Sequence, residues 1–60
     1  MLYVAGEDIG VDQTVVVRKS DGLVYRSGPE PADCLGVAVE RLREGFRVIA
    51  KDGEVREDDA

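Results

Sequence analysis

The stretch VVVRKSDGLVYR, residues 15–26, reads as a β-hairpin and decides which other elements the chain needs. Its first half is rich in β-branched residues, as strands are, and Ser20-Asp21-Gly22 has the composition of a hairpin turn. We therefore predict strands over residues 14–19 and 23–27. Successive side chains of a strand alternate between its two sides, so three consecutive valines cannot all face the core.

The length of the turn fixes which valines face inward, because a shift of one residue moves every side chain to the other face. A two-residue loop would pair Val17 with Arg26 and mix apolar and charged groups on both faces. A three-residue loop, with Gly22 in the left-handed conformation, pairs Val17 with Tyr25 and yields one apolar face. We predict the three-residue loop. The expected core face carries Val15, Val17, Leu23 and Tyr25.

The opposite face of this predicted hairpin carries the candidate partner-binding residues. They are Val16, Arg18, Val24 and Arg26. Arginine stems can cover valines and leave an ordinary surface, whereas aliphatic groups flanked by arginine also match the composition of protein interfaces. A third reading is an anion or a nucleic-acid strand held by the arginines. Of these three interpretations, we predict a protein partner.

Apolar periodicity predicts a helix after the hairpin, over residues 31–44. The residues at helical spacing are Leu35, Ala38, Val39, Leu42 and Phe46. Pro31 suits the first turn of a helix, and Gly45 suits the left-handed position that ends one. Additional strands are expected at residues 2–5 and 46–51, with a turn at Asp52-Gly53.

These elements predict one α+β domain spanning residues 1–60. The expected order is β-β-β-α-β, with a small antiparallel sheet of three to four strands and one helix packed on one face. The charged C-terminal tail is expected to fray from about residue 56, since chain ends that are not tied down are poorly ordered.

Composition narrows the classes of function. The chain has thirteen acidic and eight basic residues and a net charge of −5, which disfavours nucleic acid as a partner. A domain of this length buries only about 60% of its unfolded surface and gains from added stabilisation. With one cysteine and no histidine, an internal disulfide is impossible and a zinc site is disfavoured. Self-association and unusually good packing remain as routes, and of these we expect a homo-oligomer.

The chain offers little for catalysis or for a cofactor. The acidic residues Glu7, Asp8 and Asp12 lack the spacing of a calcium loop, and no phosphate-binding glycine motif is present. Cys34 has no histidine to activate it, which favours an unreactive thiol. We predict no enzyme, no metal and no cofactor. The lack of a membrane-spanning apolar segment and of a basic, apolar leader predicts a cytoplasmic protein.

The prediction from sequence is thus a small protein-interaction module. We expect it to self-associate and to act as a subunit, adaptor or inhibitor of a larger assembly. Exposed edges at residues 2–5 or 46–51 would offer a second route, through strand addition. The alternative function is a regulatory domain that binds nucleic acid or anions through the exposed arginines of the hairpin.

Overall fold

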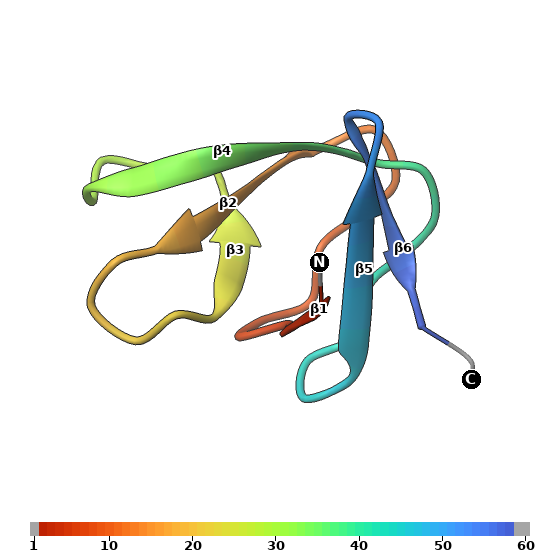
Figure 1. Ribbon diagram of the computed structural model, residues 1–60, viewed down its shortest axis with the longest axis horizontal. Helices are drawn as coiled ribbons and strands as arrows, with labels where there is room; N and C mark the ends of the chain where they lie inside the picture. Colours follow the sequence, from red (N-terminus) through yellow and green to blue (C-terminus); the bar gives the residue numbers. More distant parts are fainter. Residues whose placement is uncertain (1, 59–60) are drawn as a thin grey trace.

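The computed structural model describes residues 2–58 and shows a single mixed β-sheet (Figure 1). Six strands follow one another along the chain. They are β1 (Leu2–Val4), β2 (Thr14–Arg18), β3 (Val24–Arg26), β4 (Ala32–Ala38), β5 (Arg47–Lys51) and β6 (Glu54–Glu57). No helix occurs within the described range, so none there is long and apolar enough to cross a membrane. The predicted α+β class is therefore wrong.

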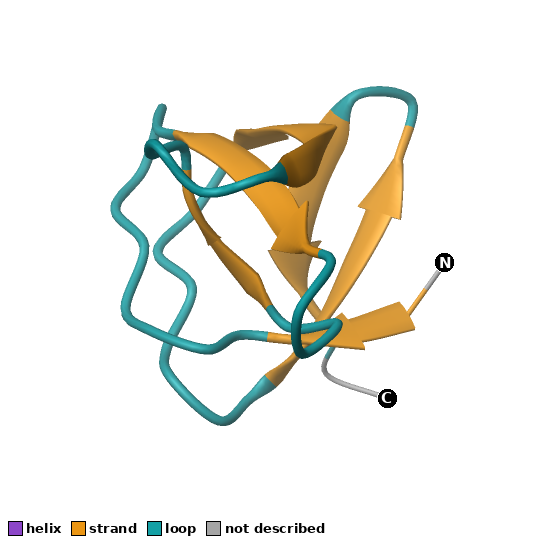
Figure 2. Ribbon diagram, turned by 90° about the vertical axis from the view of Figure 1, so that its left-hand side faces the viewer, coloured by secondary structure: helices purple, strands orange, loops and turns teal. Residues whose placement is uncertain are grey.

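The sheet curls until its two ends meet. The strand order is β1-β5-β6-β4-β2-β3, with β4 and β6 parallel and the other pairs antiparallel. Ala5 directly follows β1 and bridges to Val24 of β3, and the N–H of Gly6 donates to the carbonyl oxygen of Val24 at 2.8 Å. Figure 2 shows the strands curving around a shared interior. The sheet buries its own inner face, which leaves no need for a covering helix.

The hairpin formed by β2 and β3 has a register that differs from both sequence alternatives. Val16 pairs with Tyr25 and Val17 with Val24, and the N–H of Arg18 donates to Leu23, which leaves a four-residue loop at residues 19–22. Gly22 is left-handed as predicted, with φ of 75°. The predicted three-residue loop is wrong. Asp21 helps to explain the longer loop, because its carboxylate accepts the Leu23 N–H at 2.9 Å.

The segment expected to be helical forms β4 and a loop instead. Its register with β2 shifts at one point, where Val15 pairs with Gly36 and Val16 with Cys34. Leu35 is thus the extra residue of a bulge, and it packs against the core as Ala38 does. The bulge interrupts the alternation of the strand, so two inward residues fall three apart and imitate helical spacing. Gly36 also disfavours a helix, by about 1 kcal/mol relative to alanine.

Two long loops close one end of the sheet. The loop after β1 and the loop after β4 pair through Ile9 and Leu42, whose backbone groups exchange two hydrogen bonds of 2.8 Å. Both side chains are fully buried. Gly45 is left-handed, as predicted, but it lies in a turn rather than at the end of a helix. Its N–H donates to the carbonyl oxygen of Ala5.

The core consists of small aliphatic residues from the strands and from these loops. Its buried members are Ala5, Ile9, Val15, Val24, Ala38, Leu42, Val48 and Val55. Burial of this apolar surface stabilises the fold. The segment after Val55 is part of β6 as far as Glu57, and residues 59–60, where fraying was also expected, lie outside the described range.

Candidate interaction face

The four residues predicted to form a binding face are not brought together on one side of the hairpin. Directly opposed residues of an antiparallel pair point to the same side, so Val24 lies with Val17 on the inner side. Val24 is fully buried in the core. Val16 lies on the outer side with Tyr25 and is only 9% exposed. The register error explains this, because a one-residue slip exchanges the two faces.

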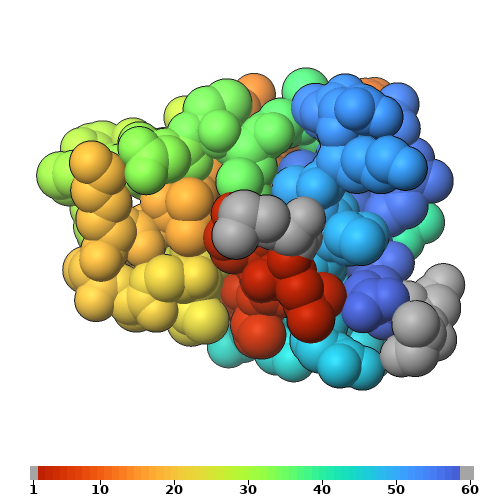
Figure 3. Space-filling view, viewed as in Figure 1, coloured from red at the N-terminus to blue at the C-terminus, as the bar shows by residue number. Residues whose placement is uncertain are grey.

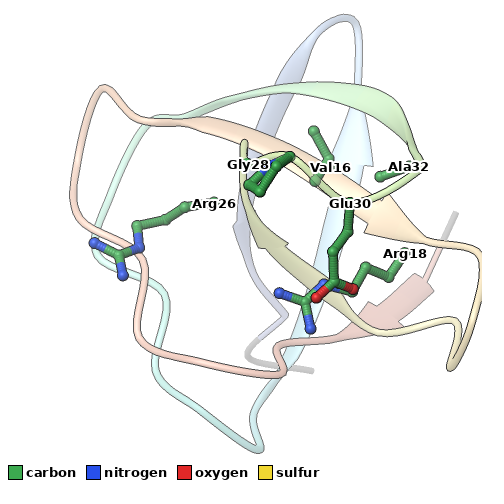
Figure 4. Close-up of a pocket in the computed structure, with 7 residues that line it drawn as sticks. Val16, Arg18, Arg26, Gly28, Glu30 and Ala32 are labelled. Carbon is green, nitrogen blue, oxygen red and sulfur yellow. The ribbon is translucent and has the colours of Figure 1, made fainter.

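Val16 is covered by the segment that leads into β4. Residues 28–32 pass over the outer side of the hairpin and enclose a hollow of about 50 Å³ (Figure 4). Ligand pockets measure about 300–1,000 Å³, so this hollow is too small for a metabolite. Its size suits a water molecule or two.

The two predicted arginines point in different directions and each faces an acid. Arg18 lies beside Glu30, with Nε and Oε2 3.3 Å apart, whereas Arg26 extends away from them in Figure 4. Arg26 lies 3.5 Å from the carboxylate of Glu7, which also accepts the Arg26 backbone N–H. Each of these cations therefore already has an anionic neighbour. This arrangement disfavours phosphate binding on the hairpin.

Tyr25 and Asp21 form a polar cluster above Arg18. The Arg18 guanidinium lies 3.7 Å from the centre of the Tyr25 ring, and the Tyr25 hydroxyl donates to Asp21 at 2.5 Å. That hydrogen bond, together with the one from the Leu23 N–H, lowers the pKa of Asp21. The same hydrogen bond raises the pKa of Tyr25, since the carboxylate favours the protonated phenol. Both groups stay in their ordinary charge states near neutral pH, so the cluster orders the hairpin loop.

A different surface gathers the exposed apolar side chains. Seven large apolar residues are exposed among residues 2–58: Leu2, Val4, Val11, Val37, Val39, Phe46 and Ile49. Five of them point outward from β1, β5 and the C-terminal end of β4. We call this surface the outer face, and define it by Leu2, Val4, Val37, Val39, Arg47, Ile49, Lys51, Glu54 and Arg56.

Strand register makes the outer face continuous. Ile49 lies between Leu2 of β1 and Arg56 of β6, and Glu54 of β6 lies between Lys51 and Val37. The intervening residues, such as Val48 and Val55, are fully buried on the inner side. Figure 3 shows β1 in red and β5 in light blue as neighbouring parts of one surface. An exposed apolar patch with arginine at its margin is typical of a protein interface.

The outer face and its two flanking aspartates together carry no net charge. Arg47, Lys51 and Arg56 are basic; Glu54 lies among them, and Asp52 and Asp58 lie at the ends of β6. Six of the chain's 21 charged residues thus cancel here, and the net charge of −5 belongs to the rest of the chain. Arg56 and Glu54 form an ion pair of 2.7 Å. An open hollow of about 390 Å³ is lined by Ile49, Lys51, Asp52, Glu54 and Arg56.

The sequence carries a signal for the outer face in the strand predicted at residues 46–51. RVIAK at residues 47–51 alternates charged or exposed residues with Val48 and Ala50, as a strand with one buried side does. The strand predicted at residues 46–51 is confirmed as β5. The expectation that this strand is a sheet edge is wrong, because β5 is paired on both sides, with β1 and with β6. β1 does end the strand order, as the expected edge at residues 2–5 requires.

No protein-family model, no curated protein and no solved structure matches this chain. The function must therefore be argued from the surface itself. Across residues 2–58, no three side chains of histidine, cysteine, aspartate or glutamate cluster in a way that could hold a metal ion. Cys34 is a free, exposed thiol on the outer side of β4, directly across from Val16.

Proposed function

We propose that this protein is a small, non-enzymatic interaction module that self-associates through the outer face and serves as a subunit, adaptor or inhibitor of a larger assembly. The observation that carries the proposal is the gathering, on this one surface, of five of the seven large apolar residues that are exposed between residues 2 and 58. Scattered exposed apolar side chains are normal. A contiguous group of them is unfavourable in contact with water, and burying it in an interface lowers the free energy.

The size of the surface supports a second copy as the partner. A standard interface buries about 800 Å² on each side, which is about one fifth of the 3847 Å² accessible surface of this chain. The outer face spans four of the six strands. A domain of this length also has little core of its own, so covering Leu2, Ile49 and Val39 adds stabilisation that the monomer lacks.

The distribution of charge favours self-association through the outer face rather than through another part of the surface. Two chains of net charge −5 repel one another over most of their area. The outer face has a net charge of +2, which its flanking Asp52 and Asp58 offset, so two copies repel one another less there. The alternative function, binding of nucleic acid or anions, has less support, because Arg18 and Arg26 lie beside Glu30 and Glu7.

We propose further that the module works in the cytoplasm. The exposed thiol of Cys34 is compatible with a reducing compartment, where it would not oxidise to a disulfide.

The test compares two aspartate substitutions of exposed apolar residues. Ile49→Asp places a charge at the centre of the outer face, whereas Val11→Asp places one in the loop after β1, outside the residues that define the outer face. Light scattering coupled to size exclusion measures the mass of each variant, and circular dichroism checks that each stays folded. We expect Ile49→Asp to be monomeric and Val11→Asp to match the unmodified protein. Equal masses for all three proteins would refute the proposal.

A further inference from the structure

Glycine directly follows aspartate at two places in the chain, Asp21-Gly22 and Asp52-Gly53. Glycine has no side chain, so its backbone nitrogen can approach a neighbouring group closely. Both pairs are exposed, the first in the hairpin loop and the second in the turn between β5 and β6 (Figure 1). We propose that Asp52 is a site of spontaneous covalent modification, in which aspartate is converted to isoaspartate through a cyclic imide formed with Gly53.

The reaction needs only these two residues and solvent water. The nitrogen of Gly53 attacks Cγ of the protonated Asp52 carboxyl and forms a C–N bond. The nitrogen loses its proton, and the carboxyl hydroxyl leaves with a proton as water. A second water molecule then adds to the main-chain carbonyl carbon of the imide and breaks the bond from that carbon to nitrogen. The chain now runs through the Asp52 side chain, so the backbone gains a CH₂ group while the composition of the protein is unchanged.

The turn at Asp52-Gly53 can reach the geometry that this reaction requires. The φ values of 55° and 78° are typical of a type I′ turn. Ring closure needs Cβ and the Gly53 nitrogen on the same side of the Asp52 Cα–C bond, at ψ of about −120°, which is the value in a type II′ turn. The two turn types differ by rotation of their central peptide. After the rotation Gly53 has a negative φ, which glycine adopts as readily as a positive one.

No hydrogen bond within residues 2–58 holds this central peptide. The Asp52 carbonyl oxygen accepts none and the Gly53 N–H donates none. The exposed Asp52 carboxylate likewise has no hydrogen bond or ion pair in that range. The Gly53 carbonyl oxygen accepts the Val37 N–H, but it belongs to the next peptide. The rotation therefore breaks no hydrogen bond.

The other aspartate–glycine pair is restrained by hydrogen bonds. The Gly22 N–H donates to the carbonyl oxygen of Arg18 at 2.9 Å. The Asp21 carboxylate accepts the Tyr25 hydroxyl at 2.5 Å and the Leu23 N–H at 2.9 Å. These bonds must break before the nitrogen can reach the carboxyl carbon. They also lower the pKa of Asp21 and so reduce the fraction of protonated carboxyl, which is the form that reacts. Asp21 is thus a control within the same molecule.

The modification disturbs the joint between the two parts of the outer face. The Gly53 carbonyl oxygen that accepts the Val37 N–H also lies against Gly36. An added CH₂ group changes the length of the turn and displaces this oxygen. We expect the modified protein to unfold at a lower denaturant concentration and to self-associate less tightly. Only the loss of self-association rests on the proposed function.

Incubation of the protein in water enriched in the heavy oxygen isotope tests the inference, because hydrolysis of the imide adds a heavy oxygen to the modified residue. Cleavage after arginine, in ordinary water, then yields peptides 19–26 and 48–56, each with one aspartate–glycine pair. Mass spectrometry measures the heavy oxygen, and chromatography separates the isoaspartyl form. In the folded protein, we expect peptide 48–56 to react at least about tenfold faster than peptide 19–26. In guanidinium chloride, which removes the restraining hydrogen bonds, the two peptides should react at similar rates.

Two variants check the cause of the difference. Asp52→Glu lengthens the side chain so that the five-membered ring cannot form, and peptide 48–56 should then gain no heavy oxygen. Tyr25→Phe removes a hydrogen bond from Asp21, and peptide 19–26 should then react roughly tenfold faster.

The outcomes separate this inference from the proposed function. Equal rates for the two peptides in the folded protein would overturn the inference. So would a reaction at Asp52 in guanidinium chloride but none in the folded protein, or heavy oxygen in peptide 48–56 of Asp52→Glu. A monomeric unmodified protein would overturn the proposed function alone, because the heavy oxygen is measured on the peptides.

Discussion

Gly36 of β4 and Gly53 of the turn between β5 and β6 are packed backbone against backbone. A Cβ atom on Gly36 would overlap the carbonyl oxygen of Gly53, and the φ of Gly36 is 151°, which side-chain-bearing residues rarely adopt. The N–H of Val37 donates to that same Gly53 oxygen at 2.9 Å. This contact joins β4 to the β5–β6 hairpin and holds the two parts of the outer face together.

Gly36→Ala should therefore destabilise the protein by about 2–4 kcal/mol, through overlap and backbone strain. Gly28→Ala is the control, because a Cβ there meets its nearest atom at 3.9 Å, an ordinary contact. Urea unfolding followed by circular dichroism measures both. A Gly36→Ala protein as stable as Gly28→Ala would contradict the packing described.

The hairpin register predicts unequal effects of truncating two valines. Val24 is fully buried and Val11 is 56% exposed. Val24→Ala should cost about 2 kcal/mol of unfolding free energy because it leaves a cavity in the core. Val11→Ala should change it by less than about 0.5 kcal/mol. Equal, small effects in urea unfolding would instead support the three-residue loop, which turns Val24 outward.

Protonation of Glu57 makes the stability of the fold depend on pH in the acidic range. Its carboxylate accepts hydrogen bonds from the side chain of Arg43, at 2.9 and 3.1 Å, and from the Arg43 N–H, and these lower the pKa of Glu57 below 4.5. A lowered pKa in the folded state means that the stabilisation is complete above about pH 4.5 and is lost as the pH falls further.

Glu57→Gln should thus lower stability at pH 7 and reduce the further loss of stability between pH 5 and about pH 3. Glu44→Gln, at an exposed residue of the neighbouring loop, serves as the control. Thermal unfolding across this pH range measures the difference. The same pH profile for Glu57→Gln and Glu44→Gln would contradict the stabilising role of the Glu57 carboxylate.

The Tyr25 hydroxyl provides a spectroscopic reading of the hairpin loop. Its hydrogen bond to Asp21 raises the pKa of Tyr25 above 10.0. The stabilisation from this bond is present below about pH 10 and is lost as the pH rises through the raised pKa. Asp21→Asn should lower the pKa of Tyr25, as measured by phenolate absorbance in a Tyr3→Phe background. An unchanged titration would show that the two side chains do not interact.

Local sequence signals predicted four of the six strands between residues 2 and 58 and the turn at Asp52-Gly53, but not β4, β6 or the length of the hairpin loop. The β-branched run at residues 14–18 forms β2, and Asp52-Gly53, with φ of 55° and 78°, makes the two-residue turn that such a pair favours. Gly22 is left-handed as expected. These features depend on neighbouring residues and on steric limits of the backbone, which a single sequence displays.

The features that were predicted wrongly depend on contacts between residues far apart in the sequence. The bulge at Leu35 gave β4 a helix-like spacing, and its true partners, β2 and β6, are far away in sequence. Closure of the sheet through Ala5 and Val24 has no local signal. The candidate site failed for the same reason. Whether the side chain of Val24 or Ile49 faces the core or water depends on strand register and sheet closure rather than on the type of residue.

The most direct test of the account is the mass of the unmodified protein in solution. Sedimentation equilibrium over a range of concentrations should show a reversible species of twice the 6.5 kDa mass of one chain. Raising the salt concentration should weaken it only modestly, because apolar contacts carry most of the interface. A mass of 6.5 kDa at every concentration would contradict the claim that a second copy covers the outer face.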